Sequence, residues 1–393
     1  MASDFLNSIV RPEREALRVR NTLRAIPPVD QGADLYLLHE GRTVLNLASN
    51  NYLGLAGTPA LREGAAAALD AWGTSSGASR LITGNFALYD QLEASLAAFK
   101  EQEAALVVGS GFAANLSIFS ALADRSTLVF SDRLNHASII DGIRVSGARH
   151  VRYRHNDLDH LQRLLHTHRE HPRKILVTDT VFSMDGDTAD LRALCELCEQ
   201  YKVFTVVDEA HATGIYGQGR GMAFAQGVSR RIVLHMGTFS KAFGSYGGYI
   251  AGPREVIDLI TSRGRAFVFS TALPPAVIGA SFAALEEVAR DHSRSERLVH
   301  ISQRLRKTLH SLGLDTCGST THIIPVLIGE NQAALQAQKL LLDRGIFVAA
   351  VRPPTVPQGT ARLRISLRSD CSDRDLDSVE EAFTRCHKDF GCA

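Results

Sequence analysis

The chain has 393 residues, 45% of them hydrophobic, which is enough to bury a large core and suggests two or three domains. Its 43 Lys and Arg residues balance 42 Asp and Glu residues, so no global field exists to attract nucleic acid or an anionic membrane. The sequence contains no run of 18 apolar residues and no signal-peptide pattern, and its six cysteines do not suggest a disulfide framework. We therefore expect a cytoplasmic protein that binds neither nucleic acid nor membrane.

Along the chain, a polar start gives way to apolar runs that alternate with helical patterns. Residues 1–45 predict a helix over about 4–24, and 43–55 predict a strand that runs into a turn. Short runs rich in Val, Ile and Phe follow at 104–111, 126–132, 174–187, 204–212, 231–241 and 247–253, with helical stretches at 88–103, 157–170 and 189–202. Continuous apolar strands that alternate with helices predict an α/β fold with a mostly parallel central sheet covered on both faces.

The pattern changes after about residue 290. A charged helix over 295–313 precedes shorter apolar and helical segments, which predicts a smaller α+β domain. We therefore divide the chain into an N-terminal segment (1–48), a large α/β domain (49–288) and a small C-terminal domain (289–393). Cys195 and Cys198 form a CxxC pair, but their helical spacing and the absence of a second pair favour a buried helix face over a metal site.

The most informative segment is Thr238–Gly244, where Lys241 follows a predicted strand among hydroxyl residues and glycine. A lysine that forms a Schiff base needs a site that lowers its pKa, and neighbouring hydroxyls can bind a phosphate. Taken alone, the segment is equally compatible with a solvated loop lysine.

A second strand ends in a carboxylate at Asp208, with Glu209 next and His211 three residues on. Pyridoxal 5'-phosphate (PLP) needs an anionic partner that keeps its ring nitrogen protonated, so that the ring accepts carbanion electrons. Asp208 suits that position, whereas Glu209 could point away as a surface or supporting acid. His211 could contact the phenolic oxygen of the cofactor or could be a capping or packing histidine.

Three further strand ends carry polar groups. Gly109–Asn115 is a short glycine-rich turn before a helix, a place where backbone N–H groups bind phosphate. His136 follows another strand and could stack on an aromatic ring, although a lone histidine is more often structural. Ser183 ends a third strand. Because reactive groups of such sheets gather beyond the carboxyl ends of the strands, this joint occurrence predicts a single site.

At these residues the sequence resembles the α-oxoamine synthases, which are fold-type I PLP enzymes. The resemblance covers about residues 15–385, and its motifs are ASNNYLGL, GASRLITGN, SGFAAN, NHASIIDG, VFSMDGD, VDEAHATGIYG, GTFSKAFG and FSTALPP. It implies a PLP-dependent acyltransferase that joins an amino acid to an acyl thioester, in a homodimer with shared active sites. An aminotransferase, or a helper subunit that keeps the fold without the cofactor, would be the more distant alternatives.

The resemblance also implies roles for individual residues. Lys241 carries the cofactor, Asp208 pairs with the ring nitrogen, His136 stacks on the ring, and His211 contacts the phenolic oxygen. The other implied cofactor contacts are Ser183, the phosphate ligands Gly111, Phe112 and Thr238, and Thr271, which would reach the phosphate of the neighbouring subunit. The implied substrate contacts are Arg364 for the amino-acid carboxylate, Arg24 and Thr355 for the acyl group, Asn50 near the site, and His136, which polarises the thioester carbonyl.

One loop, Val351–Pro357 with Thr360–Arg364, is similar to the branch that makes 8-amino-7-oxononanoate for biotin. That branch condenses L-alanine with a pimeloyl thioester, carried by CoA or by acyl-carrier protein, and releases CO2 and the free thiol. Asn51 and Glu209 stand where this branch more often has Asp. Another α-oxoamine synthase, such as glycine C-acetyltransferase (2-amino-3-ketobutyrate CoA ligase), therefore remains the alternative.

Overall fold

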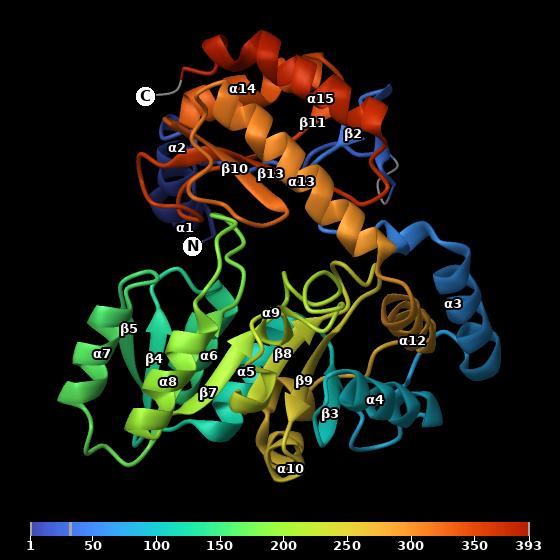
Figure 1. Cartoon of the computed structure of the whole chain (residues 1–393), viewed down its shortest axis with the longest axis vertical. Helices are drawn as coiled ribbons and strands as arrows, with labels where there is room; N and C mark the ends of the chain where they lie inside the picture. The colour runs from blue at the N-terminus through green and yellow to red at the C-terminus, as the bar shows by residue number, and fades with distance from the viewer. Residues whose placement is uncertain (1, 31–33, 392–393) are drawn as a thin grey trace. The chain divides into compact units, whose positions relative to one another are not determined.

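The structure is a computed structural model that describes residues 2–30 and 34–391 (Figure 1). The chain forms two compact units. Unit 1 comprises the chain up to Ser49, a short piece at Met184–Gly186, and the chain from Val299 onward. Unit 2 comprises Asn50–Ser183 and Asp187–Leu298. The N-terminal and C-terminal parts of the sequence thus belong to one unit.

Unit 2 is built on a seven-stranded sheet with the strand order β3-β9-β8-β7-β6-β4-β5. Its strands are β3 (Ala104–Val108), β4 (Leu128–Asp132), β5 (Arg149–Tyr153), β6 (Lys174–Asp179), β7 (Phe204–Asp208), β8 (Leu234–Thr238) and β9 (Gly248–Gly252). The neighbours from β8 to β5 pair in parallel, and β9 runs antiparallel to β3 and β8. The expected mostly parallel α/β sheet is confirmed.

Both faces of this sheet are covered, because every residue of β3, β4, β6, β8 and β9 is buried. The main helices of unit 2 are α3 (Pro59–Trp72), α4 (Ala87–Phe99), α5 (Gly111–Leu122), α6 (Ala137–Ser146), α7 (Leu158–Thr167), α8 (Leu191–Tyr201), α10 (Arg254–Arg263) and α12 (Pro275–Arg290). Short helical turns lie at η2 (Leu55–Gly57), α9 (Met222–Ala225), η3 (Ser229–Arg231) and α11 (Arg265–Val268). Apolar side chains of α5, α6 and α10 form one buried cluster with the strands.

Two glycines lie where helices α3 and α12 of unit 2 cross. A Cβ placed on Gly64 of α3 would lie 2.7 Å from the carbonyl oxygen of Gly279 in α12. A Cβ placed on Gly279 would lie 2.2 Å from the carbonyl oxygen of Gly64. These distances are shorter than van der Waals contact allows, so the two helices approach this closely only because both residues lack a side chain.

Unit 1 contains two small sheets. One has the order β1-β2-β11, from β1 (Tyr36–His39), β2 (Arg42–Asn46) and β11 (Ile346–Phe347), and the other is the antiparallel set β10 (Ile323–Gly329), β13 (Ala361–Ser366) and β12 (Ala349–Val351). The helices are α14 (Asn331–Asp343), α15 (Asp373–Cys386) and η4 (His387–Asp389), while α13 (Ser293–Ser311) begins in unit 2 and ends in unit 1. The expected small α+β part is confirmed.

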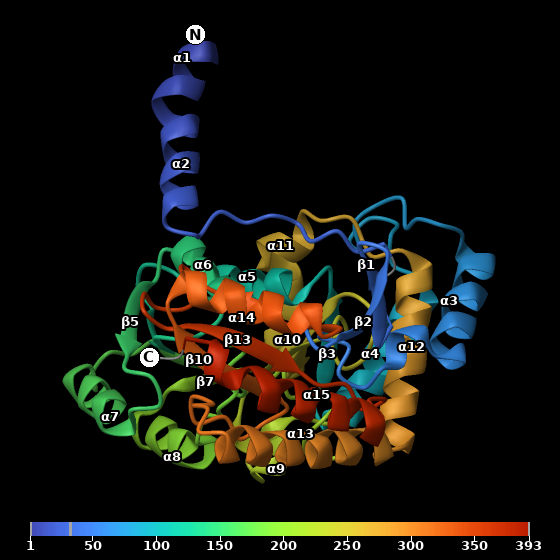
Figure 2. The same ribbon diagram turned by 90° about the horizontal axis from the view of Figure 1, so that it is seen from above.

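The N-terminal helix is shorter than the sequence predicts. Figure 2 shows α1 (Ala2–Phe5), η1 (Leu6–Val10) and α2 (Arg11–Val19) as one continuous helical rod. The rod ends at Val19 rather than near residue 24, because Asn21 adopts a positive φ of 53°, which breaks the right-handed helix. Among the described residues, no helix is both long enough and apolar enough to cross a membrane.

A buried ion pair joins α4 to the end of β7. The side chains of Lys100 and Glu209 are both fully buried, and the Lys100 ammonium donates to Glu209 and to the carbonyl oxygen of Arg220. Glu209 also accepts from the backbone N–H of Ala223 at 3.0 Å and lies 3.1 Å from Nδ1 of His235. Burial alone would raise the pKa of Glu209, but Lys100 and His235 lower it to about 2. Glu209 is therefore an ionised core residue and not a surface acid.

Replacing Lys100 by Met should destabilise unit 2, because the Glu209 carboxylate would stay buried without its cation. We expect a loss of about 3–5 kcal/mol in the free energy of unfolding, measured by urea denaturation at pH 7. Lys202→Met is the matched control, because Lys202 is exposed and makes no ion pair in the described part of the chain. Equal stability of the two variants would contradict the assigned role of the pair.

Candidate functional site

A cavity of about 210 Å³ lies in unit 2 beyond the carboxyl ends of the central strands. The ends of β6, β7 and β8 and the start of α5 contribute to its walls, as expected for a parallel sheet. Eight residues named from the sequence line it together: Gly111, Phe112, His136, Ser183, Asp208, His211, Thr238 and Lys241. The predicted convergence of the strand ends in one place is therefore observed.

Asp208, the last residue of β7, is buried and held by two neutral donors. One carboxylate oxygen accepts from Nδ2 of Asn115 at 2.9 Å, and the other accepts from the backbone N–H of Ala210 at 2.9 Å. Among the described residues, Asp208 forms no ion pair. A buried carboxylate that has only neutral partners attracts a cation, so this wall of the cavity suits a positively charged ring nitrogen.

Another part of the wall is suited to an anion. It contains the N-terminus of α5, a twelve-residue helix, where Ser110 caps the helix by accepting from the backbone N–H of Ala113. A Cβ on Gly111 would meet the side chains of Met236 at 3.0 Å and Thr238 at 3.6 Å, so only glycine leaves this space open. The Thr238 and Ser240 hydroxyls hydrogen-bond to each other at 2.8 Å. Exposed helix N–H groups beside two hydroxyls are a phosphate-binding arrangement.

Lys241 lies in a hydrogen-bonded chain of polar side chains. Its Nζ is 2.9 Å from Nε2 of His211, and Nδ1 of His211 is 2.7 Å from the hydroxyl of the fully buried Tyr52. The Tyr52 hydroxyl donates to Oδ1 of Asn50 at 3.0 Å. One tautomer satisfies the chain, with His211 donating from Nδ1 to Tyr52 and accepting at Nε2 from Lys241. Asn50 therefore reaches the site through Tyr52.

His136 is the N-cap residue directly before α6, and its backbone binds a second buried acid. Its backbone N–H donates to Oδ2 of Asp179 at 2.7 Å, and its Nδ1 is 2.7 Å from the Ser138 hydroxyl. Burial lowers the pKa of the His136 imidazole, although the Asp208 carboxylate acts in the opposite direction. Burial, with the Asp208 charge next, raises the pKa of Asp179 well above its ordinary value. Because its pKa is lowered, the His136 imidazole is neutral at neutral pH.

Three residues of the site were missed in the sequence. Asp179 was the easiest to find, because it ends β6 directly opposite Asp208 in the strand register. Asn115 lies within the apolar pattern of α5, and Tyr52 lies in a turn far away in sequence, so only the fold reveals their contacts with Asp208 and His211.

The remaining predicted residues lie outside this cavity. Thr271 pairs with Ser79 in an isolated bridge and lines a separate small cavity of unit 2. Arg24, Thr355 and Arg364 belong to unit 1. The Arg24 guanidinium donates to the Thr355 hydroxyl at 2.6 Å, and the buried Arg364 donates to the Ser366 hydroxyl at 2.7 Å.

Unit 1 has a cavity of its own, of about 490 Å³, which Arg24 and Thr355 line. Its other lining residues are partly apolar, including Leu335, Leu342 and Phe347, and partly cationic, including Lys339 and Arg352. The pKa of Arg352 is lowered, mainly by burial and to a smaller extent by the positive charge of Arg24 nearby. No Asp or Glu is among the described residues that line this cavity, which suits a ligand with an apolar chain and an anionic group.

Known proteins match this chain over most of its length. Residues 42–383 match the family model for aminotransferase class I and II. A protein from Bacillus cereus (strain Q1), named as a candidate 8-amino-7-oxononanoate synthase, is 47% identical over 363 residues and 92% of each chain. A protein of the same name from Bacillus anthracis is 46% identical over 375 residues and 95% of each chain.

Solved structures agree with this match. Serine palmitoyltransferase of Sphingomonas wittichii superimposes with a TM-score of 0.92 at 28% identity, over 100% of this chain and 99% of that one. A serine palmitoyltransferase variant from S. paucimobilis with a bound PLP–myriocin aldimine gives 0.93, also at 28% identity, over 100% and 99%. The 8-amino-7-oxononanoate synthase of Francisella tularensis gives 0.75 at 25% identity, over 88% and 97%.

The cavity of unit 2 offers an anion site, an unpaired buried carboxylate and an amine, which are the groups that PLP requires. With the matches over almost the whole length, this donor set identifies the chain as a member of the aminotransferase class I and II family, in its α-oxoamine synthase branch, with pyridoxal 5'-phosphate as its cofactor.

Proposed function

We propose that this enzyme condenses L-alanine with a pimeloyl thioester, carried by CoA or by acyl-carrier protein, to give 8-amino-7-oxononanoate, CO2 and the free thiol. The observation that carries the proposal is the 46–47% identity to candidate 8-amino-7-oxononanoate synthases over more than nine tenths of each chain. The cavity of unit 1 supports it, because its described lining is apolar with several cations and no acid, which suits a dicarboxylic acyl chain and its carrier.

PLP, when bound, supplies an electron-accepting ring that stabilises a carbanion at the α-carbon of the amino acid. Asp208 would keep the ring nitrogen protonated, and Asn115 and the Ala210 amide would hold its carboxylate in place. The amides of Gly111 and Phe112 and the Thr238 hydroxyl would bind the phosphate. Ser183 and His211 would contact the rest of the ring, and Thr271 would serve the phosphate site of a second copy in a homodimer.

The amine Nζ of Lys241 has two proposed roles. Its Nζ would hold the cofactor until alanine binds and would then take the α-proton, which makes it the general base. His211 is 2.9 Å away and can accept a hydrogen bond from Nζ, so the amine is oriented before it acts. His136 would lie against the ring and donate a hydrogen bond to the thioester carbonyl, for which its neutral form is suitable because one ring nitrogen still carries a proton.

Three of the proposed substrate contacts, Arg364, Arg24 and Thr355, come from unit 1. Arg364 would bind the alanine carboxylate through two parallel hydrogen bonds, which fixes the direction of the bond to the α-proton. Arg24 and Thr355, already 2.6 Å apart, would contact the acyl group. Asn50 would support the site through Tyr52.

A second candidate is another α-oxoamine synthase, because serine palmitoyltransferases superimpose with TM-scores of 0.92–0.93. Glycine C-acetyltransferase belongs to the same group of alternatives. These enzymes share the cofactor chemistry and differ in the amino acid and the acyl chain. The alternatives therefore concern the substrate only.

Release of thiol and CO2 from a panel of substrates separates these alternatives. Alanine, glycine and serine would each be paired with pimeloyl, acetyl and palmitoyl thioesters, on CoA and on acyl-carrier protein. We expect the highest kcat/KM for alanine with a pimeloyl thioester. A higher value for serine with palmitoyl-CoA or for glycine with acetyl-CoA would refute the proposed substrates and leave the family assignment intact.

Lys241→Ala should remove both the covalent link and the base. Borohydride reduction of the PLP-loaded wild-type protein should leave a modified peptide that contains Lys241, detected by mass spectrometry, and the variant should show none. Its kcat should fall by about 10²–10⁴-fold, the usual contribution of a positioned base. Lys202→Ala is the control, and modification at a lysine other than Lys241 would contradict the assignment.

Arg364→Lys should weaken amino-acid binding, because an ammonium cannot form the two parallel bonds of a guanidinium. We expect the KM for alanine to rise about tenfold, the equivalent of 1.4 kcal/mol, while the visible absorbance of bound PLP stays at its wild-type value. Arg374→Lys, the same change at an exposed arginine, should change neither the KM for alanine nor the absorbance of bound PLP. An unchanged KM in the Arg364 variant would exclude Arg364 as the carboxylate ligand.

A further inference from the structure

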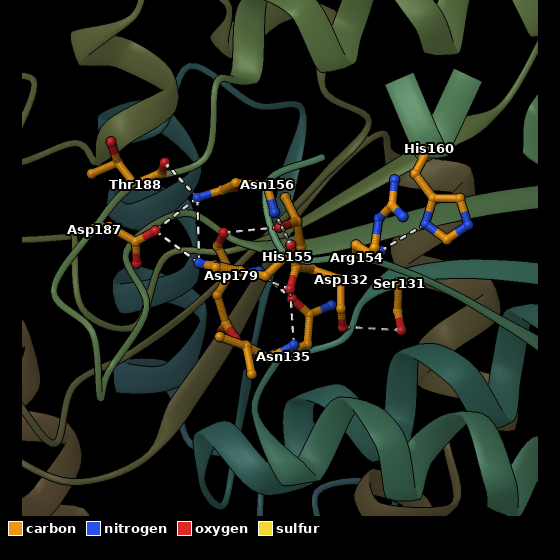
Figure 3. A network of polar contacts seen from close by, with 12 residues as sticks. Ser131, Asp132, Asn135, Arg154, His155, Asn156, His160, Asp179, Asp187 and Thr188 are labelled. Carbon is orange, nitrogen blue, oxygen red and sulfur yellow. Dashed lines mark hydrogen bonds and ion pairs between the residues drawn. The ribbon is translucent and has the colours of Figure 1, made fainter. Parts of the chain in front are cut away.

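A network of polar side chains surrounds His155, just after the edge strand β5 (Figure 3). The His155 ring lies between two carboxylates, with Nδ1 at 3.0 Å from Asp132 and Nε2 at 2.8 Å from Asp187. The Asp132 side chain is fully buried, and those of His155 and Asp187 are 23% and 19% exposed. None of these three residues lines the cofactor cavity.

The geometry requires the charged form of His155. A neutral imidazole has one N–H and can donate to only one acceptor, whereas both ring nitrogens here face carboxylate oxygens. Burial lowers the pKa of His155, but the hydrogen bonds to Asp132 and Asp187 outweigh it and raise the pKa to about 10. His155 is therefore an imidazolium at neutral pH.

The Asp132 side of the network leads to His136. The Asp132 oxygen that faces His155 also accepts from the backbone N–H of Leu134 at 2.8 Å, which fixes the turn after β4. Asn135 in this turn donates to the Val177 carbonyl at 2.9 Å and accepts from the backbone N–H of Asp179 at 3.1 Å. The next residue is His136, bound through its own N–H to Asp179. The turn that His155 fixes is thus the turn that presents His136 to the cavity.

The Asp187 side leads to Ser183. Asp187 closes the loop after β6, because its carbonyl accepts from the backbone N–H of Phe182 at 3.1 Å. The His155 ring also packs edge-on against the Phe182 ring, with 4.5 Å between the ring centres. Oδ1 of Asp187 is buried without a hydrogen-bond partner, so its charge is balanced through Oδ2, which contacts His155 and Nδ2 of Asn156. The loop held in this way begins with Phe182 and Ser183.

We propose that His155 is a positioning residue of the cofactor cavity, whose imidazolium holds the turn after β4 and the loop after β6 so that they present His136 and Ser183. His155 acts through these two segments and touches no reacting atom. The proposal concerns the PLP-binding cavity and does not depend on which amino acid or thioester the enzyme uses.

The protonation state is tested on the full-length protein with ¹⁵N-labelled histidine. Both His155 ring nitrogens should show N–H resonances at pH 8.5, with assignment by loss of the signals in His155→Asn. The stability that the bound proton gives the folded state is fully present below the unfolded pKa near 6.5, and it is lost as the pH rises through the folded pKa of about 10. A neutral His155 ring at pH 8.5 would overturn the proposal.

The positioning role is tested by PLP titration, the visible circular dichroism of bound PLP, and kinetics. His155→Asn should raise the Kd for PLP about tenfold, as expected when charged hydrogen bonds are lost, and should reduce the dichroism and lower kcat more than it raises KM. His166→Asn, the same change at an exposed histidine of α7, should leave the Kd for PLP, the dichroism and the kinetic constants at wild-type values.

Asp187→Asn keeps the His155–Asp132 contact and removes one carboxylate, so it serves if His155→Asn does not fold. The rise in the Kd for PLP should be smaller for Asp187→Asn than for His155→Asn. The variant that carries both substitutions should bind PLP no more weakly than His155→Asn alone. A variant of lower thermal stability with wild-type PLP affinity and dichroism would show a purely structural residue and overturn the proposal. Additive effects in the double variant would also overturn it.

Discussion

The arrangement of unit 2 depends on the burial of four carboxylates at the ends of neighbouring strands. Asp132 ends β4, Asp179 ends β6, and Asp208 ends β7, with Glu209 directly after it; none of them is more than 6% exposed. A buried carboxylate is costly unless it has a partner, so each of these acids constrains the residues around it. The site can be understood from how each charge is balanced.

Two of the four acids are balanced by cations outside the cavity. Lys100 pairs with Glu209, and His155 pairs with Asp132, so both acids serve the structure. The other two, Asp179 and Asp208, line the cavity and receive hydrogen bonds only from neutral groups in the described part of the chain. This division leaves the Asp208 carboxylate, whose hydrogen bonds come from neutral groups, facing the cavity, where a cationic ring can bind.

The sequence predicts the parts of this arrangement that follow from strand order. Lys241, Asp208, His136 and Ser183 each follow an apolar run, and a parallel sheet brings such ends together, so their convergence could be expected. The sequence does not predict β5, because an edge strand lacks the continuous apolar run of a central one, and its RHVRY segment is largely accessible to solvent. His155 follows that strand, which is why its network was visible only in the structure. Asn115 was hidden for a different reason, since a polar residue within a helix gives no signal of what it faces.

The division into two units explains why the chemistry is better defined than the substrate. Every residue proposed to hold PLP within one chain lies in unit 2, and serine palmitoyltransferases share the fold of the chain at 28% identity. Because a shared fold and cofactor do not fix the substrate, the choice of acyl chain must be sought in residues that differ among relatives. The residues proposed to contact the acyl group belong to unit 1, where Arg24, Lys339 and Arg352 line an apolar cavity with no acid among its described lining residues. Three cations in such a cavity favour an acyl group or carrier that brings its own negative charge, and they would gain nothing from a purely hydrocarbon chain.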